Sequence, residues 1–165
     1  MKNKKGLIFV LIILMSVGFA AVTTTLIING TTIVAENEED YQVYFSGAIV
    51  DKEDYTNEII SKDKKTITFE TKELMKENDT SELKYDVTNG STQYDANVSI
   101  KVSKENDDLI EVTNTYDDSK NLSARETRTG VLTVKLKRGI TEAKDVKIKV
   151  ELIFNAEERE EIDNT

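Results

Sequence analysis

Two Ser-x-x-Lys pairs in this chain have the spacing of a familiar catalytic arrangement. They are Ser61 with Lys64 and Ser81 with Lys84. In enzymes that carry this pattern, the lysine acts as the base for a serine nucleophile, and it needs an apolar pocket that lowers its pKa. Ser61 lies in a polar segment, and Lys84 falls on the polar side of an alternating run. We therefore expect neither pair to be catalytic.

The chain contains no histidine and no cysteine. This excludes a Ser-His or Cys-His nucleophile, a thiolate zinc site and a disulfide. Carboxylates are abundant, but strand candidates such as Asp86 and Glu151 fall on polar faces, where the pKa stays near its ordinary value. General acid catalysis needs a buried or paired carboxyl group. We expect no enzyme, no catalytic residue and no cofactor.

Two acidic segments are candidate cation sites, because calcium takes carboxylate and carbonyl oxygens and needs no histidine. They are Asn106–Asp108 and Tyr116–Asp118, and neither has the EF-hand spacing. We interpret both as solvated turns and predict no metal ligand, with calcium as the alternative. A Lys-Asn isopeptide bond is a further alternative, for which the sequence indicates no pair.

Tyrosines and arginines are the remaining candidates for recognition. One possibility for the six tyrosines is a platform on which sugars stack. We expect instead that they pack in the core with the hydroxyl at its rim. They are Tyr41, Tyr44, Tyr55, Tyr85, Tyr94 and Tyr116. Arg125, Arg128 and Arg138 either bind a partner's carboxylates or belong to charged loops, which is the interpretation we favour.

Alternation of apolar and polar residues predicts the elements that position these side chains. It is clearest over Tyr94–Val102 and Val146–Phe154. Shorter runs are Tyr41–Phe45, Ile67–Phe69, Leu83–Val87, Ile110–Val112 and Leu132–Leu136. Only Thr71–Glu77 and Glu157–Ile162 suggest a helical turn. We predict one immunoglobulin-like antiparallel β-sandwich over residues 36–156, followed by an acidic tail, 157–165.

The first 35 residues have the pattern of an export leader. Lys2, Lys4 and Lys5 precede an apolar run from Leu7 to Ile28, and no acidic residue occurs before Glu36. As a helix this run would extend about 33 Å, enough to cross a bilayer. The lysines favour a cytoplasmic N-terminus. We predict an N-terminal apolar helix, in residues 1–35, that places the rest of the chain outside the cytoplasm.

The sequence leaves the processing of this leader open. Small residues suit a signal peptidase after Ala35 and after Ala20, of which Ala35 follows the more polar stretch. Retention would make the leader a membrane anchor. A third alternative is a pilin-type leader that opens at Gly6, although pilins usually carry Glu where Leu11 stands.

The net charge of the predicted exported part limits the kinds of partner that it can bind. Three of the 22 basic residues are the leader lysines and all 31 acidic residues follow Ala35, so the part from Glu36 onward has a formal charge of −12. Such a surface repels nucleic acid and keeps a domain soluble. We expect no nucleic-acid partner.

Three segments carry a resemblance to a known group: Gly18–Gly30, Val43-Tyr44-Phe45-Ser46 and Tyr85–Ser91. The chain resembles small exported β-sandwich surface proteins of Gram-positive bacteria, related to biofilm-matrix fibre and camelysin-like proteins. Their pattern is an apolar leader, an aromatic-Phe-Ser step in the first strand and an Asn-Gly turn between core strands. The protease activity described for camelysin-like proteins is not implied here, because the chain has no histidine.

The sequence therefore predicts a non-catalytic structural or binding module on the outer face of the plasma membrane or released to the cell surface. The resemblance implies a matrix or fibre subunit that assembles by strand addition. In this version cleavage after Ala35 makes Glu36 the N-terminus, and Tyr41, Val43 and Phe45 form the added strand. The partners would be further copies or a surface protein, and the membrane if the leader is kept. The alternatives are an anchored adhesin or ligand-binding domain and a pilin-like subunit.

Overall fold

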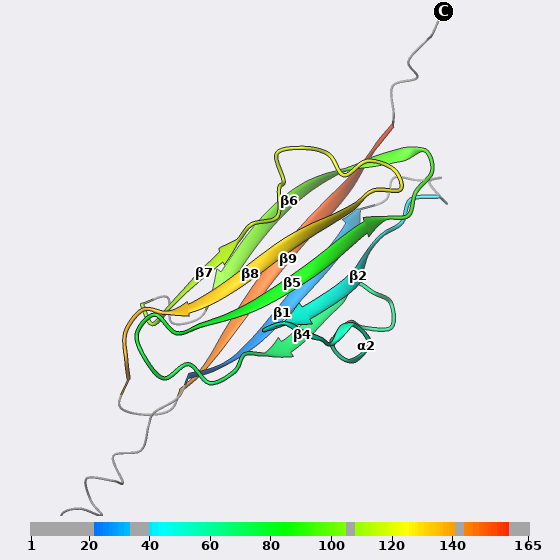
Figure 1. Cartoon of the computed structure of the whole chain (residues 1–165). Helices are drawn as coiled ribbons and strands as arrows, with labels where there is room; N and C mark the ends of the chain where they lie inside the picture. The colour runs from blue at the N-terminus through cyan, green and yellow to red at the C-terminus, as the bar shows by residue number, and fades with distance from the viewer. Residues whose placement is uncertain (1–21, 34–39, 105–107, 141–143, 159–165) are drawn as a thin grey trace, which may run out of the picture.

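The chain folds into two facing β-sheets in a computed structural model, which describes residues 22–33, 40–104, 108–140 and 144–158. The elements in these residues are β1 (Val22–Ile33), β2 (Val43–Val50), β3 (Glu53–Asp54), α2 (Thr56–Ile59), β4 (Thr66–Glu70), β5 (Thr80–Asn89), β6 (Tyr94–Lys104), β7 (Ile110–Asn114), β8 (Thr127–Leu136) and β9 (Lys144–Glu158). Figure 1 shows their arrangement. Within the described ranges, no helix has the length and apolar character needed to cross a membrane.

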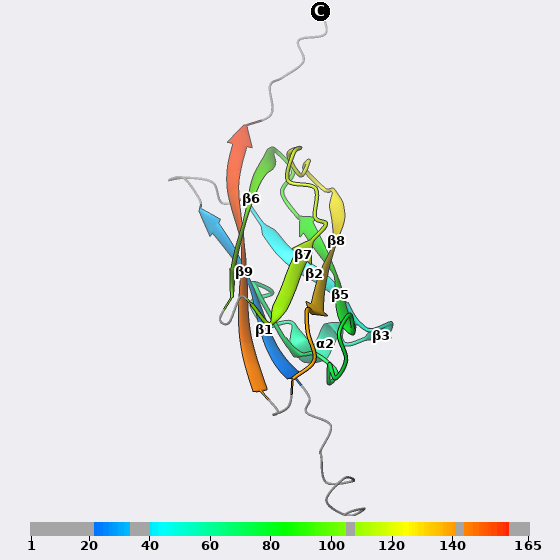
Figure 2. The same ribbon diagram turned by 90° about the vertical axis from the view of Figure 1, so that its left-hand side faces the viewer.

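The strands form a four-stranded and a five-stranded sheet. Their orders are β4-β1-β9-β6 and β3-β2-β5-β8-β7. Seen from the side, β1, β6 and β9 form one layer and β5 and β8 lie in the other (Figure 2). This confirms the predicted all-β sandwich. The prediction that it is wholly antiparallel is wrong for one pair, because β1 runs parallel to β9.

Alternating side chains of both sheets fill the space between them. The four-stranded sheet contributes Ile28, Ile67, Phe69, Ala96, Val98, Val146, Ile148, Val150, Leu152 and Phe154. The five-stranded sheet contributes Val43, Phe45, Ala48, Val50, Leu83, Tyr85, Val87, Ile110, Leu132, Val134 and Leu136. The predicted strands over Tyr94–Val102 and Val146–Phe154 are confirmed. The expected residues of the second strand are all buried, whereas in the first strand Ala96 and Val98 are buried and Val102 is 41% exposed.

The predicted apolar helix over Leu7–Ile28 is wrong from Val22 onward, where the chain is strand β1. Leu7 to Ala21 lie outside the described residues. β-Branched residues dominate Val22–Ile33, and they favour a strand over a helix. Ile28 is fully buried while Ile27 is 39% exposed, which is the alternation of a strand with one face inward. The sheet therefore includes residues before Glu36, where we placed the start of the β domain.

Short helical segments also differ from the prediction. Thr71–Glu77 forms no helix, because Leu74 is buried in the core and the Asp79 carboxylate accepts bonds from the backbone N–H groups of Met75 and Lys76. In the part of the chain that the structure describes, the single helical turn is α2 instead. At the C-terminal end, β9 continues to Glu158, so the predicted helical turn there is wrong at its first two residues; 159–165 lie outside the described range.

Candidate functional site

β1 occupies a slot between two strands that are far from it in sequence. It pairs in parallel with β9 along its whole length, from Val22 opposite Lys144 to Ile33 opposite Asn155. On its other side, five of its residues pair with β4. Among the described strands β4 has no other ladder partner. Removing β1 would therefore separate β4 from the sheet and open one edge of β9.

The centre of β1 touches the opposite sheet closely. A Cβ added at Gly30 would lie 3.2 Å from Cε2 of Phe45, a β2 side chain, and the Gly30 N–H donates to the Lys65 carbonyl at 2.6 Å. Only glycine allows this approach without displacing the ring. Gly30 thus brings β1 close to the facing sheet and bonds it to the residue before β4.

The two candidate cleavage positions affect β1 in opposite ways. Ala20 and Ala35 both lie outside the described residues. β1 begins at Val22, after Ala20, and ends at Ile33, before Ala35. Cleavage after Ala20 would leave β1 attached to the domain, whereas cleavage after Ala35 would separate it from the rest of the chain.

The predicted strand-addition segment lies within the chain's own fold. Tyr41, Val43 and Phe45 are buried, and β2 pairs with β5 from Val43 onward. On the outer side, the Phe45 N–H donates to the Lys64 carbonyl at 2.9 Å, and the Lys65 ammonium donates to the Val43 carbonyl. Partial burial lowers the pKa of Lys65. Addition of this segment to a neighbour stays a prediction, and it would require breaking these bonds.

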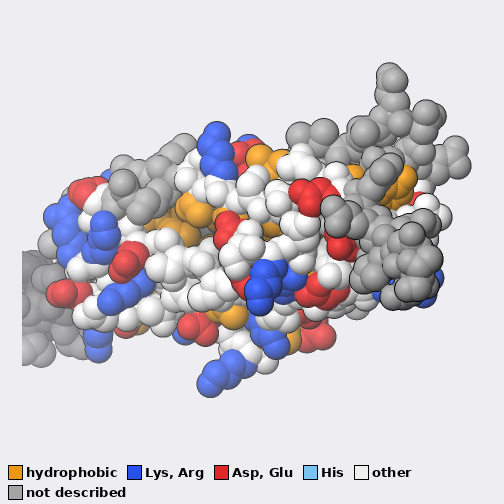
Figure 3. Space-filling view, turned by 90° about the horizontal axis from the view of Figure 1, so that it is seen from above, with side chains coloured by type: hydrophobic (Ala, Val, Ile, Leu, Met, Phe, Trp, Pro, Cys, Tyr) orange, Lys and Arg blue, Asp and Glu red, His pale blue; other side chains and the backbone are white. Residues whose placement is uncertain are grey.

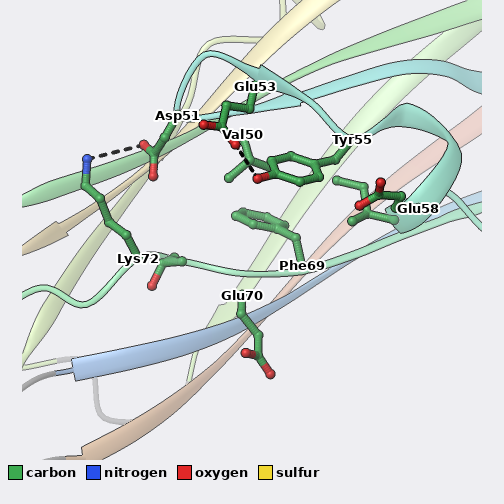
Figure 4. Close-up of a pocket in the computed structure, with 10 residues that line it drawn as sticks. Val50, Asp51, Glu53, Tyr55, Glu58, Phe69, Glu70 and Lys72 are labelled. Carbon is green, nitrogen blue, oxygen red and sulfur yellow. Dashed lines mark hydrogen bonds and ion pairs between the residues drawn. The ribbon is translucent and has the colours of Figure 1, made fainter.

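A pocket of about 520 Å³ opens between β2, β3, α2 and the end of β4 (Figure 4). Val50, Ile59 and Phe69 give it an apolar wall, and Tyr55 lies over them with its hydroxyl on the Glu53 carboxylate at 2.5 Å. That bond is the first cause of the raised pKa of Tyr55, followed by the charge of Glu53.

The rim of this pocket is mostly acidic. Its charged lining residues are Asp51, Glu53, Glu58, Glu70 and Lys72. Lys72 lies 3.5 Å from Asp51, and the Asp51 carboxylate also accepts bonds from Ser81 and from the Glu82 N–H. Apolar walls and uncompensated carboxylates suit an organic cation with a hydrocarbon body.

No family model and no curated protein matches this chain. The resemblance to exported surface proteins therefore rests on the residues quoted for it. Of these, the Asn89-Gly90-Ser91 turn has a clear structural role. Asn89 is fully buried, and its amide donates to the carbonyls of Tyr94 and Leu122 at 2.9 and 3.0 Å. Its side-chain oxygen accepts the Ser91 N–H. Asn89 thus ties the β5–β6 turn to the loop that precedes β8.

The Ser-x-x-Lys pairs are not assembled as catalytic sites. Ser81 faces inward and Lys84 outward on β5, and Ser81 donates to Asp51. Ser61 donates to Asp63 at 2.5 Å, while the Lys64 ammonium lies 4.9 Å from the centre of the Tyr44 ring. In neither pair does the lysine contact its serine through the side chain in the described structure.

The acidic residues and the arginines form local hydrogen bonds and ion pairs within their own loops. Asp117 accepts bonds from the N–H and hydroxyl of Ser119, the main causes of its lowered pKa. Asn106 and Asp107 lie outside the described residues, and the described ones contain no group of carboxylates that could hold a metal. Arg138 pairs with Asp108 at 2.9 Å on the exposed surface, and Arg125 is also exposed.

Arg128 has the clearest role of the three arginines. Its guanidinium donates to the carbonyls of Asp117, Lys120 and Asn121 and to the Glu126 carboxylate, which closes the loop before β8. It also lies 5.8 Å from the centre of the Tyr116 ring. These bonds occupy the guanidinium within its own chain, so Arg128 is not placed to bind a partner's carboxylate.

The tyrosines confirm the packing interpretation at two positions. Tyr85 and Tyr116 are buried and stack with 6.2 Å between ring centres, and the Tyr85 hydroxyl donates to Asn114. Burial raises the pKa of Tyr116 to about 12. An added Cβ at Gly130 would lie 2.5 Å from the Tyr85 ring, so glycine is required there. These rings are not available as a sugar platform.

The face seen from above carries interspersed acidic and basic side chains with small hydrophobic areas between them (Figure 3). No single-sign patch dominates this view. Among the described residues, the acidic pocket and the open edges of the sheets offer more specific surfaces than this mixed face.

Proposed function

We propose that this protein is a non-catalytic structural subunit that acts outside the cytoplasm, at the cell surface or in a matrix, and assembles by strand addition. The observation that supports it best is the position of β1. A strand that lies within the predicted export leader completes the four-stranded sheet by pairing on both sides. The same slot in a second copy would accept the same strand with the same hydrogen bonds.

Processing of the leader decides whether a copy can donate this strand. Cleavage after Ala20 gives a chain that starts at Ala21 and keeps β1 attached through residues 34–39. We expect Ala21 as the N-terminus in the native host, measured by mass spectrometry. Met1 would instead indicate an anchored module, Leu7 a pilin-like subunit and Glu36 a released chain that has lost β1; each of these contradicts the proposed assembly.

A peptide with the sequence of residues 22–33 tests the slot directly. Added in excess to the chain that starts at Ala21, it should compete for the slot and shorten or abolish the assemblies seen by electron microscopy and light scattering. The peptide with Ile28→Lys should not compete, because Ile28 is fully buried, whereas the peptide with Ile27→Lys should, because Ile27 is 39% exposed. Assemblies that are unaffected by the unmodified peptide would contradict the proposal.

The finer features of the proposal come from the sequence. They are an immunoglobulin-like strand arrangement, export from a Gram-positive bacterium and an apolar helix before Val22. The helix would consist of residues that the structure does not describe, such as Leu7–Met15. Until its removal, it would hold the domain at the outer face of the plasma membrane.

The acidic pocket supports a second candidate function, an anchored ligand-binding domain. Its apolar wall and its carboxylates suit a lysine side chain of a surface protein. Titration calorimetry with N-acetyl-lysine methylamide would test this. Glu70→Gln should weaken binding severalfold, and Glu111→Gln, on β7 and outside the pocket, should leave it unchanged. Absence of binding at millimolar ligand would dispose of this candidate.

A further inference from the structure

The open edge of β6 is an interaction surface that the proposed assembly through β1 does not use. β6 is an outer strand of its sheet and pairs only with β9, from Tyr94 opposite Glu158 to Lys104 opposite Ile148. The loop before β8 covers the beginning of its free edge through the bridge from Leu122 to Ala96. In the described residues, nothing covers this edge from Val98 to the end of the strand.

The bridge at Ala96 shows which backbone groups point outward. The Ala96 N–H donates to the Leu122 carbonyl at 2.9 Å, and the Leu122 N–H returns a bond at 2.8 Å. In an antiparallel strand both groups of one residue point to the same side, and the side alternates along the strand. The N–H and C=O groups of Val98, Ile100 and Val102 therefore also point to the free edge, where they have no partner in the described residues.

The side chains of these residues form an apolar row that becomes more exposed along the strand. Val98 is 5% exposed, Ile100 is partly buried and Val102 is 41% exposed. The outer strand of the facing sheet on this side is β7, with five residues against eleven in β6. The end of β6 thus offers unpaired backbone groups together with incompletely covered valine and isoleucine.

We infer that this edge pairs with the same edge of a second copy of the chain, related by a two-fold axis at Ile100. The strand is self-complementary in this register. Ile100 lies opposite Ile100 of the second copy, and Val98 opposite Val102, so that three residue pairs each exchange two backbone bonds. Ser99 lies opposite Lys101, and the two four-stranded sheets become one continuous sheet.

Neighbouring registers are less favourable. A shift of two residues in one direction places Val102 opposite Ala96, whose backbone groups are already bonded to Leu122. A shift in the other direction places Lys101 directly opposite Lys101 of the second copy, which is destabilising. A lysine on an edge strand is a common guard against unspecific pairing. The register centred on Ile100 avoids this lysine pair and places Val98, Ile100 and Val102 opposite apolar residues. Only Lys104, the last residue of β6, then lies opposite Ala96.

Cross-linking tests the register in the full processed chain, which contains no cysteine of its own. Ile100→Cys places two sulfurs across the two-fold axis, with about 5.5 Å between the Cα atoms, a distance that a disulfide spans. Mild oxidation should convert most of this variant to a covalent dimer. Val98→Cys is the matched control, because its copies are four residues apart in the dimer; cross-linking of Val98→Cys at the same rate would overturn the inference.

A charge exchange tests the same register without cysteine. Ser99 and Lys101 face outward, so their substitution leaves the core intact, and the folded state of each variant is checked by circular dichroism because Lys101 lies opposite Glu151 of β9. Ser99→Lys opposes two ammonium groups at both symmetric positions and should weaken association about fivefold, measured by analytical ultracentrifugation. Adding Lys101→Glu should restore it. A wild-type chain that stays monomeric at millimolar concentration, or a double variant no better than Ser99→Lys alone, would overturn the inference.

The inference stands apart from assembly through β1. The peptide of residues 22–33 competes for the β1 slot and should leave the dimer through β6 unchanged in sedimentation. Loss of filaments with retention of dimers would therefore show that the β1 slot and the β6 edge are independent interfaces. Loss of the dimer on addition of this peptide would contradict an independent interface at β6.

Discussion

β1 and β6 lie on either side of the same strand, β9, and they depend on it in different ways. β1 runs parallel to β9 and has a partner on each side, whereas β6 runs antiparallel and has one open edge. Loss of β1 divides the sheet, while loss of β6 would only narrow it. An internal strand near the start of the chain therefore governs the integrity of the fold, and the edge strand is free to take part in contacts with other molecules.

The largest effect should come from a charge placed under β1. Ile28→Lys buries an ammonium in the core and should cost about 3–5 kcal/mol of unfolding free energy. Ile27→Lys, one residue away and 39% exposed, should change it by less than about 0.5 kcal/mol. Urea denaturation followed by circular dichroism measures both. Similar values for the two variants would contradict the assignment of β1 to the sheet.

An intermediate loss of stability is expected at Asn89, which fixes the turn before β6. Asn89→Asp replaces the amide that donates to Tyr94 and Leu122 with a carboxylate that cannot donate, and should cost about 2–3 kcal/mol at neutral pH. Asn97→Asp, the same change on β6 itself, affects a partly exposed amide and should cost less than about 1 kcal/mol. Equal losses in thermal unfolding would show that Asn89 does not have this special role.

The smallest effect is expected at Asp40, whose carboxylate makes stability depend on pH. Its carboxylate accepts bonds from the hydroxyl and N–H of Thr92 and from the Gln93 N–H, and these bonds lower its pKa. A lowered pKa in the folded state gives stability that is present above the ordinary pKa of 3.8 and is lost as the pH falls through the lower, folded value. Asp40→Asn should therefore make the melting temperature less sensitive to pH as the pH falls below about 4. An unchanged pH dependence would contradict a role for this carboxylate.

The contrast between the two strands also explains what the sequence could predict. β6 alternates without error from Tyr94 to Val102, because one face is buried and the other is exposed, and its prediction is confirmed. β1 continues an apolar run, and its preceding residues fit a membrane helix by length and composition. The sequence signal for this strand is its many β-branched residues. The difference in burial between Ile27 and Ile28 cannot be read from the sequence, because both residues belong to one apolar run.

The candidate site was only partly accessible from the sequence. Tyr41–Phe45 was predicted as a strand, and β2 confirms this from Val43 onward, while its addition to a neighbour stays a prediction. The slot of β1, the pocket around Tyr55 and the bonds of Asn89 join residues that are distant along the chain. No local pattern carries that information. An isolated asparagine before a glycine predicts a turn, but not which loops its amide will join.

The pairing of β1 with β9 also sets a time scale for folding. The partners are separated by the roughly 110 residues between Ile33 and Lys144, so β9 follows β1 out of the ribosome by roughly 6–20 s at about 5–20 residues per second, and in an exported chain it also follows β1 across the membrane. Throughout this interval β1 lacks its principal partner. A finished β9 of another copy could reach it first, and the order of synthesis then decides between a self-contained domain and an exchanged one.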